Sequence, residues 1–308
     1  GVPNTMRSSD IVEIGGCCAG VPARIADILD TQHITFSPVP GFPAARRTVQ
    51  FGGPRRFEVL NRLKYLPQFL DAIAPYDVLH YHYRSHVPQF LDLPLWKALG
   101  KQVWVSFHGS DIRGQRIKAA NPFLRLADRI FVSTPDLLDT LPGAEWLPNP
   151  APEISSLTPK TTSPPVVTHC PSNPARKGTP EILAATQILQ ECGERFELHL
   201  VRGKPHAETL SEIQAADIVI DQAKIGMYGM VSIEAMACGK PVLAYLNGAR
   251  DRLPRECPIV NCGTTPAEIA SALADLLGAP SRRQDLGQKG REYAQTTHGA
   301  ANIRRILS

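Results

Sequence analysis

Short apolar runs recur along the chain and alternate with stretches in which apolar residues return at helical spacing. The runs lie at 10–14, 77–83, 102–107, 129–132, 166–170, 196–201, 217–220 and 241–245. Their length and apolar content predict strands, and the stretches between them predict helices. Strands that alternate with helices favour an α/β architecture with parallel sheets.

The distribution of proline divides this pattern in two. Residues 148–165 contain six prolines and little apolar content, which indicates a stiff linker between domains. A length of 308 residues also suits two domains, each large enough to bury a core. We therefore expect a first domain over 1–150, a linker over 151–165 and a second domain over 166–289.

The second domain contains a strand–loop–helix–strand unit within residues 217–245. Its helix is predicted from Met230 to Cys238, because Gly239 and a following proline end it. Free backbone N–H groups at the start of such a helix can bind an anion such as a phosphate. Arg176 and Lys177, which directly precede another predicted helix, could grip the same kind of ligand or could simply be exposed basic residues.

Glu234 shares an apolar face of the predicted helix with Met230, Val231 and Cys238. A carboxylate in such a place needs a partner, because burying it unpaired is expensive. The partner could be a neighbouring backbone N–H or basic side chain, or it could be the hydroxyl groups of a ligand. The spacing alone leaves both interpretations open.

Histidines lie at the carboxyl ends of two predicted strands of the first domain. His82 ends the strand of 77–83, and His108 follows the strand of 102–107. Ligands of open α/β sheets bind at this edge, which makes both histidines candidates for chemistry. Two alternatives remain: the histidines are structural, or His80, His82, His86 and His108 bind a metal ion, although no clustered carboxylate or cysteine completes such a site.

A basic segment, residues 41–64, contains six Lys and Arg residues, one acid and three phenylalanines. Such a segment could contact a membrane surface or an acidic acceptor. A solvated arginine-rich loop and helix face is the simpler alternative. We therefore expect at most a peripheral membrane contact.

Composition narrows the partners and the compartment. A net charge of +4 suits an acidic ligand such as a nucleotide diphosphate but does not indicate nucleic-acid binding. No apolar run reaches the length of a membrane span, and the first residues lack the apolar segment of a signal peptide. The seven cysteines, which include the adjacent pair Cys17 and Cys18, have no CxxC spacing. We expect a cytoplasmic protein without a metal or cofactor.

The sequence EAMACGKPV at 234–242 resembles the nucleotide-sugar motif of the retaining family 4 glycosyltransferases, also called group 1, which have the GT-B fold. The resemblance implies that Glu234 binds the ribose hydroxyls of a nucleotide-sugar donor. The family motif has a second glutamate eight residues earlier, and here that position is Gly226. Asp221 could supply an acid in its place. Because Gly226 departs from the family motif, the sequence does not identify the base or the sugar of the donor.

Further motifs extend the resemblance. PSNPARKGT at 171–179 resembles the phosphate-binding loop of the family, so Lys177 would bind phosphate and Arg176 would replace a companion arginine. HYH and FHGSDIR in the first domain are also similar to the family. The remaining implied donor-binding residues are Gly20, Arg202, His206, Tyr228, Gly229, Met230 and Val231. His108 would lie beside the reacting sugar, and the implied acceptor-side residues are His82, Asp111 and Arg113.

The resemblance implies two Rossmann-like domains that face a cleft, with a C-terminal helix, 290–308, packed back on the first domain. It implies transfer of a hexose-type sugar from a nucleotide diphosphate to a small-molecule, saccharide or lipid-linked acceptor, with retention of configuration. Lys177, Glu234 and His108 would act in catalysis, and the departing phosphate would accept the proton. The alternatives are a GT-B nucleotide-sugar epimerase and a non-catalytic nucleotide-sugar-binding protein.

Overall fold

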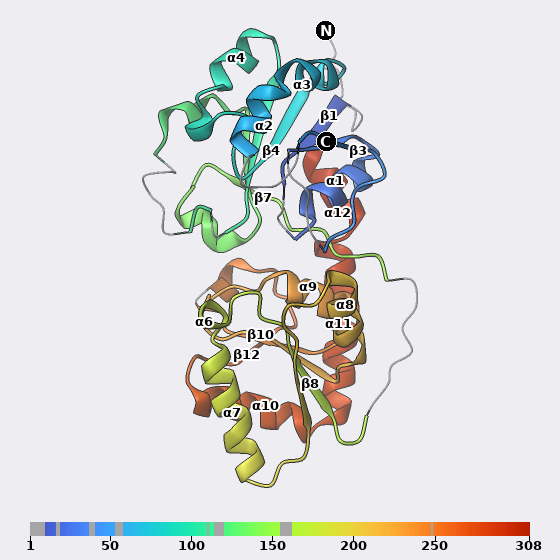
Figure 1. Ribbon diagram of the computed structural model, residues 1–308. Coiled ribbons are helices and arrows are strands. Elements are labelled where there is room, and N and C mark those ends of the chain that lie inside the picture. The colour runs from blue at the N-terminus through green and yellow to red at the C-terminus, as the bar shows by residue number, and fades with distance from the viewer. Residues whose placement is uncertain are drawn as a thin grey trace. The chain divides into compact units, whose positions relative to one another are not determined.

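The computed structural model describes residues 10–16, 19–36, 41–52, 58–109, 111–113, 120–154, 162–247 and 249–308. The chain divides into two compact units (Figure 1). The first comprises residues 1–150 and 300–308, and the second comprises residues 151–299. Each unit is built on its own parallel sheet, which confirms the predicted α/β architecture of two domains with parallel sheets.

The sheet of the first unit has seven strands in the order β3-β2-β1-β4-β5-β6-β7. Every neighbouring pair is parallel. In chain order the strands are β1 (Ile11–Ile14), β2 (His33–Thr35), β3 (Thr48–Gln50), β4 (Val78–His82), β5 (Gln102–Phe107), β6 (Arg129–Val132) and β7 (Glu145–Trp146). The central strands β1 and β4 are buried along their whole length, as strands covered on both faces should be.

The helices of the first unit are α1 (Val21–Leu29), α2 (Glu58–Lys64), α3 (Leu66–Ile73), α4 (Leu93–Ala98) and the C-terminal α12 (Ala300–Leu307). Figure 1 shows α12 beside α1, and Arg304 Nε donates a hydrogen bond to the carbonyl oxygen of Ile28 at 2.8 Å. The part of the unit that the structure describes also contains the short 3₁₀ turns η3 (Pro88–Phe90), η4 (Pro122–Leu126) and η5 (Pro135–Asp139).

The turn η5 replaces a helix that the sequence pattern predicted after β6. Thr134 stands at its N-cap position, but its side chain makes no cap hydrogen bond. The hydroxyl oxygen of Thr134 instead accepts a hydrogen bond from Arg113 Nη2 at 3.3 Å.

The sheet of the second unit has five strands in the order β12-β11-β10-β8-β9, again all parallel. In chain order the strands are β8 (Val166–His169), β9 (Glu197–Leu200), β10 (Ile218–Gln222), β11 (Val242–Ala244) and β12 (Val260–Asn261). The helices are α6 (Pro174–Lys177), α7 (Thr179–Glu191), α8 (His206–Ala215), α9 (Met230–Ala237), α10 (Pro266–Leu277) and α11 (Pro280–Thr297), with one 3₁₀ turn, η6 (Ala249–Arg252).

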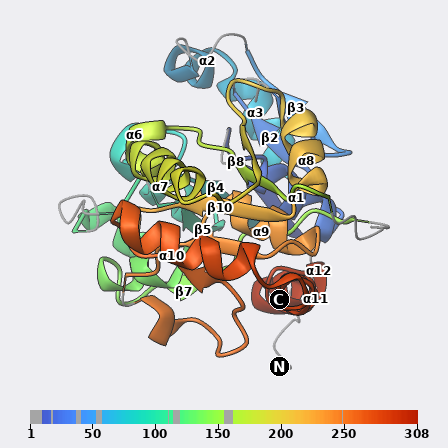
Figure 2. The ribbon, with the colours of Figure 1, turned by 90° about the horizontal axis from the view of Figure 1, so that it is seen from below.

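Helices cover both faces of this second sheet. Successive side chains of a strand point to opposite faces, so neighbouring residues of β10 enter different cores. Ile218 and Ile220 of β10 pack into a core with α7 and α10, which lie side by side (Figure 2). Val219, between them, packs into the opposite core with α8, α9 and α11. The apolar run of β10 is thus explained by burial on both sides.

The helices α9 and α11 approach each other through glycine. Gly287 of α11 faces Gly239, two residues after the end of α9, and a Cβ atom on Gly287 would clash with the carbonyl oxygen of Gly239. One turn further along α11, a Cβ atom on Gly290 would lie 3.3 Å from Cγ of Met236. No side chain larger than hydrogen fits at Gly287 in this arrangement.

Candidate functional site

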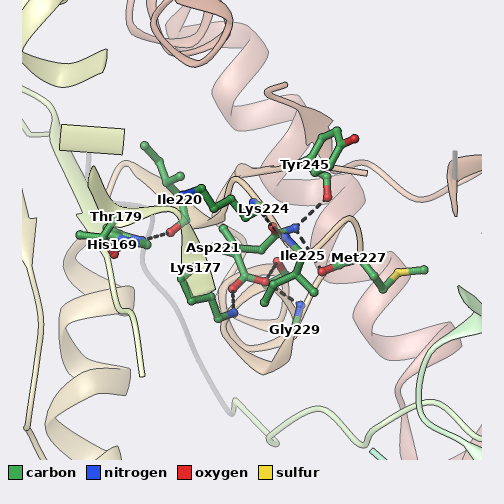
Figure 3. A network of polar contacts seen from close by, with 12 residues as sticks. His169, Lys177, Thr179, Ile220, Asp221, Lys224, Ile225, Met227, Gly229 and Tyr245 are labelled. Carbon is green, nitrogen blue, oxygen red and sulfur yellow. Dashed lines mark hydrogen bonds and ion pairs between the residues drawn. The ribbon is translucent and has the colours of Figure 1, made fainter. Parts of the chain in front are cut away.

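A buried carboxylate organises the carboxyl end of β10 in the second unit (Figure 3). Asp221 is fully buried and accepts three hydrogen bonds. The donors are Lys177 Nζ at 2.5 Å, the backbone N–H of Gly229 at 2.6 Å and the hydroxyl of Ser232 at 2.7 Å. One side chain therefore brings the predicted phosphate lysine and the start of α9 to the same point.

The charge of Asp221 is set by competing effects. Burial raises the pKa of this carboxyl group, whereas the positive charge of Lys177 and the three hydrogen bonds lower it. The lowering effects win, so the pKa of Asp221 lies below its usual value. The group is therefore a carboxylate at neutral pH, and in the ligand-free chain it balances the charge of Lys177.

The loop that carries Lys177 has a defined local structure. Asn173 caps the short helix α6, since its side chain accepts a hydrogen bond from the backbone N–H of Arg176. Gly178, with φ of 74°, reverses the chain between α6 and α7, and the backbone N–H of Ala223 donates to the carbonyl oxygen of Lys177 at 2.9 Å. These contacts aim Lys177 at Asp221, while Arg176 is exposed.

The structure identifies a partner for Glu234 on its apolar helix face. Its Oε1 atom lies 2.7 Å from Nε2 of His206, the first residue of α8. Both side chains are largely buried, with 4% of Glu234 and 11% of His206 exposed. A basic side chain is therefore present, as the first interpretation of Glu234 expected, and two predicted donor-binding residues lie in contact.

The loop between β10 and α9 explains the departure at Gly226. Gly226 has a φ of 83°, and a Cβ atom there would lie 2.8 Å from Cβ of Asn247. The amide of Gln222 holds the same loop, accepting from the backbone N–H groups of Lys224 and Ile225 and donating to the carbonyl oxygens of Met227 and Tyr245. A glutamate at 226 would be strained and crowded in this conformation.

Two expectations for the same loop need correction. Asp221 does not replace the missing glutamate in this conformation, because it is fully buried and its oxygens accept hydrogen bonds from Lys177, Gly229 and Ser232. The side chain of Tyr228 is also buried, and its hydroxyl lies 3.3 Å from that of Tyr293 and 3.0 Å from Nε2 of His298. Tyr228 thus faces α11 and not the start of α9.

The other predicted donor-binding residues lie at the start of α9 or on other loops of the two units. A Cβ atom on Gly229 would lie 3.2 Å from Nζ of Lys177, so a larger residue there would crowd the lysine. Met230 and Val231 are half-buried, and Arg202 is exposed on the turn that follows β9. In the first unit, Gly20 is the N-cap of α1 with φ of 73°, where the left-handed backbone favours glycine.

The first unit contains a second buried carboxylate, Glu13 of β1. Its Oε1 atom lies 3.0 Å from Nδ1 of His80, and its Oε2 atom lies 2.6 Å from Nε2 of His82. Nδ1 of His82 lies in turn 2.9 Å from Nε2 of His108. The predicted candidates His82 and His108 are therefore in direct contact, and their rings stack with centroids 5.1 Å apart.

Burial and hydrogen bonding control the charges of this group. Burial raises the pKa of Glu13, but the charges of His80 and His82 and their hydrogen bonds lower it to about 2. Burial lowers the pKa of His82 to about 4, and burial followed by the charge of His82 lowers the pKa of His108 to about 3. At neutral pH Glu13 is charged, and His82 and His108 are neutral.

The candidate metal ligands in the structure differ from the set of histidines that the sequence suggested. Among the described residues, ligand atoms of Glu13, His80 and His82 lie within 4.8 Å of one another. His86, which belonged to the predicted set, instead hydrogen-bonds the carbonyl oxygen of Arg62 and stacks on Phe69. The carboxylate that the sequence pattern lacked is Glu13, and the signal for it was an acid within the apolar strand of 10–14.

Asp111 and Arg113 shape the loop after β5. Both carboxylate oxygens of Asp111 lie 3.0 Å from the backbone nitrogen of His108, which donates to them. Arg113 Nε donates to Asp136 at 2.8 Å and so ties the loop to η5. Both residues therefore fix the position of the loop that follows His108; Ser110 lies outside the described residues.

The basic segment carries less free positive charge than its sequence suggests. Arg46 and Arg47 form ion pairs with Asp27 and Asp30, and Arg62 is buried and donates to the carbonyl oxygen of Ser85. Residues 53–57, with two of the arginines, lie outside the described residues, as do Cys17 and Cys18. Over the described residues, no helix combines the length and apolarity that crossing a membrane requires.

Comparison with known proteins connects this geometry to a family. Residues 184–293 match the glycosyl transferases group 1. This region runs from α7 into α11 and includes Glu234, Asp221 and the loop of Gly226. The predicted group 1 resemblance is confirmed for this part of the chain.

One similar curated protein is D-inositol 3-phosphate glycosyltransferase 2 of Catenulispora acidiphila, which is 29% identical over 123 residues. The alignment covers 39% of this chain and 29% of that protein. The chain therefore spans less than a third of the length of this relative.

Solved structures resemble the whole chain. Sucrose-phosphate synthase of Thermosynechococcus elongatus has a TM-score of 0.66 at 16% identity, over 97% of both chains. Anabaena HepE in complex with UDP and glucose has a TM-score of 0.63 at 12% identity, over 97% of this chain and 98% of HepE. UDP-GlcNAc 2-epimerase of Neisseria meningitidis has a TM-score of 0.57 at 11% identity, over 96% of this chain and 99% of the epimerase. These neighbours confirm the GT-B fold.

Proposed function

We propose that this protein is a retaining glycosyltransferase that uses a nucleotide diphosphate sugar. The observation that carries the proposal is the convergence of Lys177 Nζ and the backbone N–H of Gly229 on one carboxylate. A cation and the start of the eight-residue helix α9 therefore lie at one point, where an anionic group is favoured. The match of 184–293 to group 1 glycosyl transferases supports a diphosphate as that group.

The donor would bind as follows. Lys177 has three N–H donors, so it can keep its bond to Asp221 and still donate to a phosphate oxygen. Arg176 and Arg202, both exposed, would add positive charge for the outer phosphate oxygens. Glu234 would accept hydrogen bonds from the ribose hydroxyls while His206 orients its carboxylate. Because HepE was solved with UDP and glucose, UDP-hexoses are the first donors to test.

The reaction needs few protein groups. Negative charge develops on the diphosphate as the bond to the sugar breaks, and Lys177 with the start of α9 would stabilise it. The sugar becomes oxocarbenium-like, and the departing phosphate would accept the proton of the acceptor hydroxyl. His108 would contact the reacting sugar by hydrogen bonding. Retention of configuration and the cytoplasmic location are parts of this proposal, as is the absence of a metal requirement.

An epimerase is the second candidate, since UDP-GlcNAc 2-epimerase shares the fold. An epimerase forms product from the donor alone, whereas a transferase needs an acceptor. Because the curated relative is named for D-inositol 3-phosphate, a phosphorylated polyol is the first acceptor to test. Proton NMR of the product's anomeric signal distinguishes retention, inversion and epimerisation in one experiment.

The direct test of donor binding is thermal unfolding with UDP, GDP, ADP, TDP and their sugars. A ligand at 100 times its Kd stabilises the folded chain by about 2.7 kcal/mol, so at least one nucleotide should raise Tm. Lys177→Ala and Glu234→Ala should both reduce the shift, while Lys289→Ala, which removes an exposed cation of α11, should not. His108→Ala should lower kcat more than donor affinity. The proposal is wrong if no nucleotide raises Tm, or if the first two variants respond like the native chain.

A further inference from the structure

The buried carboxylate of Glu13 has no role in donor binding, yet it is costly to maintain. It lies on the central strand β1 and is fully buried. An ionised carboxylate in such a place needs strong hydrogen bonds to compensate for the lost water. His80 and His82 supply them, and through His82 the hydrogen-bonded chain continues to His108.

The charge of Glu13 determines the direction of the hydrogen bonds that link it through His82 to His108. A carboxylate only accepts, so Nε2 of His82 must carry a proton and donate to it. A neutral imidazole has one N–H, so Nδ1 of His82 is an acceptor and Nε2 of His108 must donate to it. His108 is also neutral, which leaves its Nδ1 atom as an acceptor.

The second oxygen of Glu13 anchors the arrangement from the other side. Nδ1 of His80 donates to Oε1 of Glu13. Nε2 of His80 lies 2.7 Å from the hydroxyl oxygen of Ser106. Each imidazole on Glu13 therefore has a second partner, which lies on β5 for His80 and directly after β5 for His82.

We propose that Glu13 is a positioning residue for His108, which it holds, through His82, with a proton on Nε2 and an acceptor at Nδ1 for a substrate hydroxyl. This inference rests on the proposed function, in which His108 contacts the reacting sugar. With Nε2 bound to His82, Nδ1 of His108 is buried and has no hydrogen-bond partner among the described residues. A sugar or acceptor hydroxyl would donate to it there.

The chemistry explains why a fixed tautomer would matter. A hydroxyl that donates to Nδ1 gains electron density on its oxygen, and the negative charge of Glu13 polarises the two imidazoles in the same direction. Both effects favour the positive charge that develops on the sugar ring. The reverse tautomer would present an N–H donor and oppose this. His33, His80 and Asp111 are the other titratable groups that act on His82 or His108.

The tautomers can be read without any substrate. We suggest labelling the histidines of the full chain with ¹⁵N and recording long-range ¹H–¹⁵N correlation spectra at pH 7. We expect His82 and His108 to be protonated on Nε2 and His80 on Nδ1. A native His108 with its proton on Nδ1, or a doubly protonated His82, would overturn the proposal.

Glu13→Gln tests the dependence on the carboxylate. Glutamine keeps the volume but accepts with one atom and donates with the other, so it cannot accept from both imidazoles. Where its N–H₂ group faces His82, we expect the proton of His108 to move to Nδ1; where its oxygen faces His82, His80 accepts from the amide and His108 keeps its tautomer. We expect kcat to fall with the fraction of chains in which the proton has moved, with the donor KM changed less than twofold. An unchanged kcat after the tautomer has reversed would contradict the proposal, and so would a tenfold loss of kcat with the tautomer of His108 kept.

Ser106→Ala is the matched control, because it removes a hydrogen bond from the His80 side of Glu13 only. It should leave the tautomers of His82 and His108 and kcat within twofold of the native values. Metal analysis of the same samples tests the competing explanation that Glu13, His80 and His82 bind a metal ion. One zinc per chain, whose removal shifts the signals of His80 and His82, would overturn the proposal in favour of a metal site. If no donor or acceptor supports transfer, the proposed function fails. The spectra still test whether Glu13 sets the tautomer of His108 through His82.

Discussion

At the scale of single residues, the two units use the same device. A buried carboxylate on a central strand, Asp221 in one unit and Glu13 in the other, accepts hydrogen bonds from the residues that the sequence pattern marked for function. In each case the pKa of the carboxyl group is lowered despite burial, because cationic or N–H partners outweigh the loss of water. Each carboxylate therefore fixes the geometry of a neighbouring site.

Lys177→Met should reveal how strongly Asp221 depends on its ion pair. The substitution leaves a fully buried carboxylate with only Gly229 and Ser232, and we expect it to lower the free energy of unfolding by about 3 kcal/mol. Adding Asp221→Asn should cost less than the sum of the single changes, as for any pair in direct contact. Urea denaturation measures all three variants.

The exposed ion pair of Lys289 with Asp285 provides the control for this cycle. It has the same charge types at 2.8 Å, but both side chains are more than half exposed, so Lys289→Met should cost less than about 1 kcal/mol. Additive effects of the Lys177 and Asp221 changes would show that the two side chains do not stabilise each other.

Some of these residues could be predicted from the sequence, and others could not. The need of Glu234 for a partner follows from its helix face, but the partner, His206, lies 28 residues away and depends on how α8 packs. Glu13 pairs with His80 because the parallel register of β1 and β4 places them opposite each other. Strand register across the sheet is a tertiary property, so local spacing could not bring Glu13 into the predicted site.

At the scale of elements, each apolar run is a strand, and the runs of β4 and β10 are apolar because both faces are buried. The short strands β2, β3, β7 and β12 lie outside the apolar runs and were missed. Predicted boundaries differ by a residue or two: β10 extends to Gln222, and α9 ends at Ala237. The missing helix after β6 is a clearer failure. There the segment is the 3₁₀ turn η5, and the hydroxyl of Thr134 bonds Arg113 without capping the turn.

Gly226→Ala should destabilise the loop before α9 more than an equivalent change elsewhere. The residue has a φ of 83°, and the added Cβ would lie 2.8 Å from Cβ of Asn247. Gly203 has a similar φ of 66° but no atom within 4 Å of its Cβ position. Alanine at 203 costs backbone strain of about 1 kcal/mol, and alanine at 226 adds the cost of the close contact.

Equal Tm losses in these two variants would mean that Asn247 yields freely, which would contradict our account of why glutamate is absent at 226. A second substitution sharpens the comparison. Gly226→Ala combined with Asn247→Gly should recover the excess loss, because it removes the atom that the new Cβ meets.

At the scale of the whole molecule, histidine burial predicts sensitivity to acid. The pKa of His82 and His86 is lowered to about 4 and that of His108 to about 3. Below about pH 6.5 these histidines are protonated in the unfolded chain but not in the folded chain. The free energy of unfolding therefore falls as pH falls. Glu13, with a pKa of about 2, adds a loss below pH 4.5 in the same direction.

The free energy of unfolding should therefore decrease between pH 6.5 and 4, by about 1.4 kcal/mol per pH unit for each proton taken up. Urea denaturation at pH 7, 6 and 5 measures the slope. His86→Gln keeps hydrogen-bonding capacity without titrating, so its slope should be smaller by the contribution of one group. A flat profile would show that these histidines are not held neutral by the fold.

The glycine contact between α9 and α11 has a consequence for the molecule as a whole. Backbone meets backbone at Gly239 and Gly287, so at this point no side chain separates the end of the segment that bears Glu234 from the long helix beside it. That long helix ends at Thr297, and the chain enters the first unit at residue 300. A displacement of Glu234 by a bound nucleotide would thus press on the helix that leads into the short connection between the two halves of the protein.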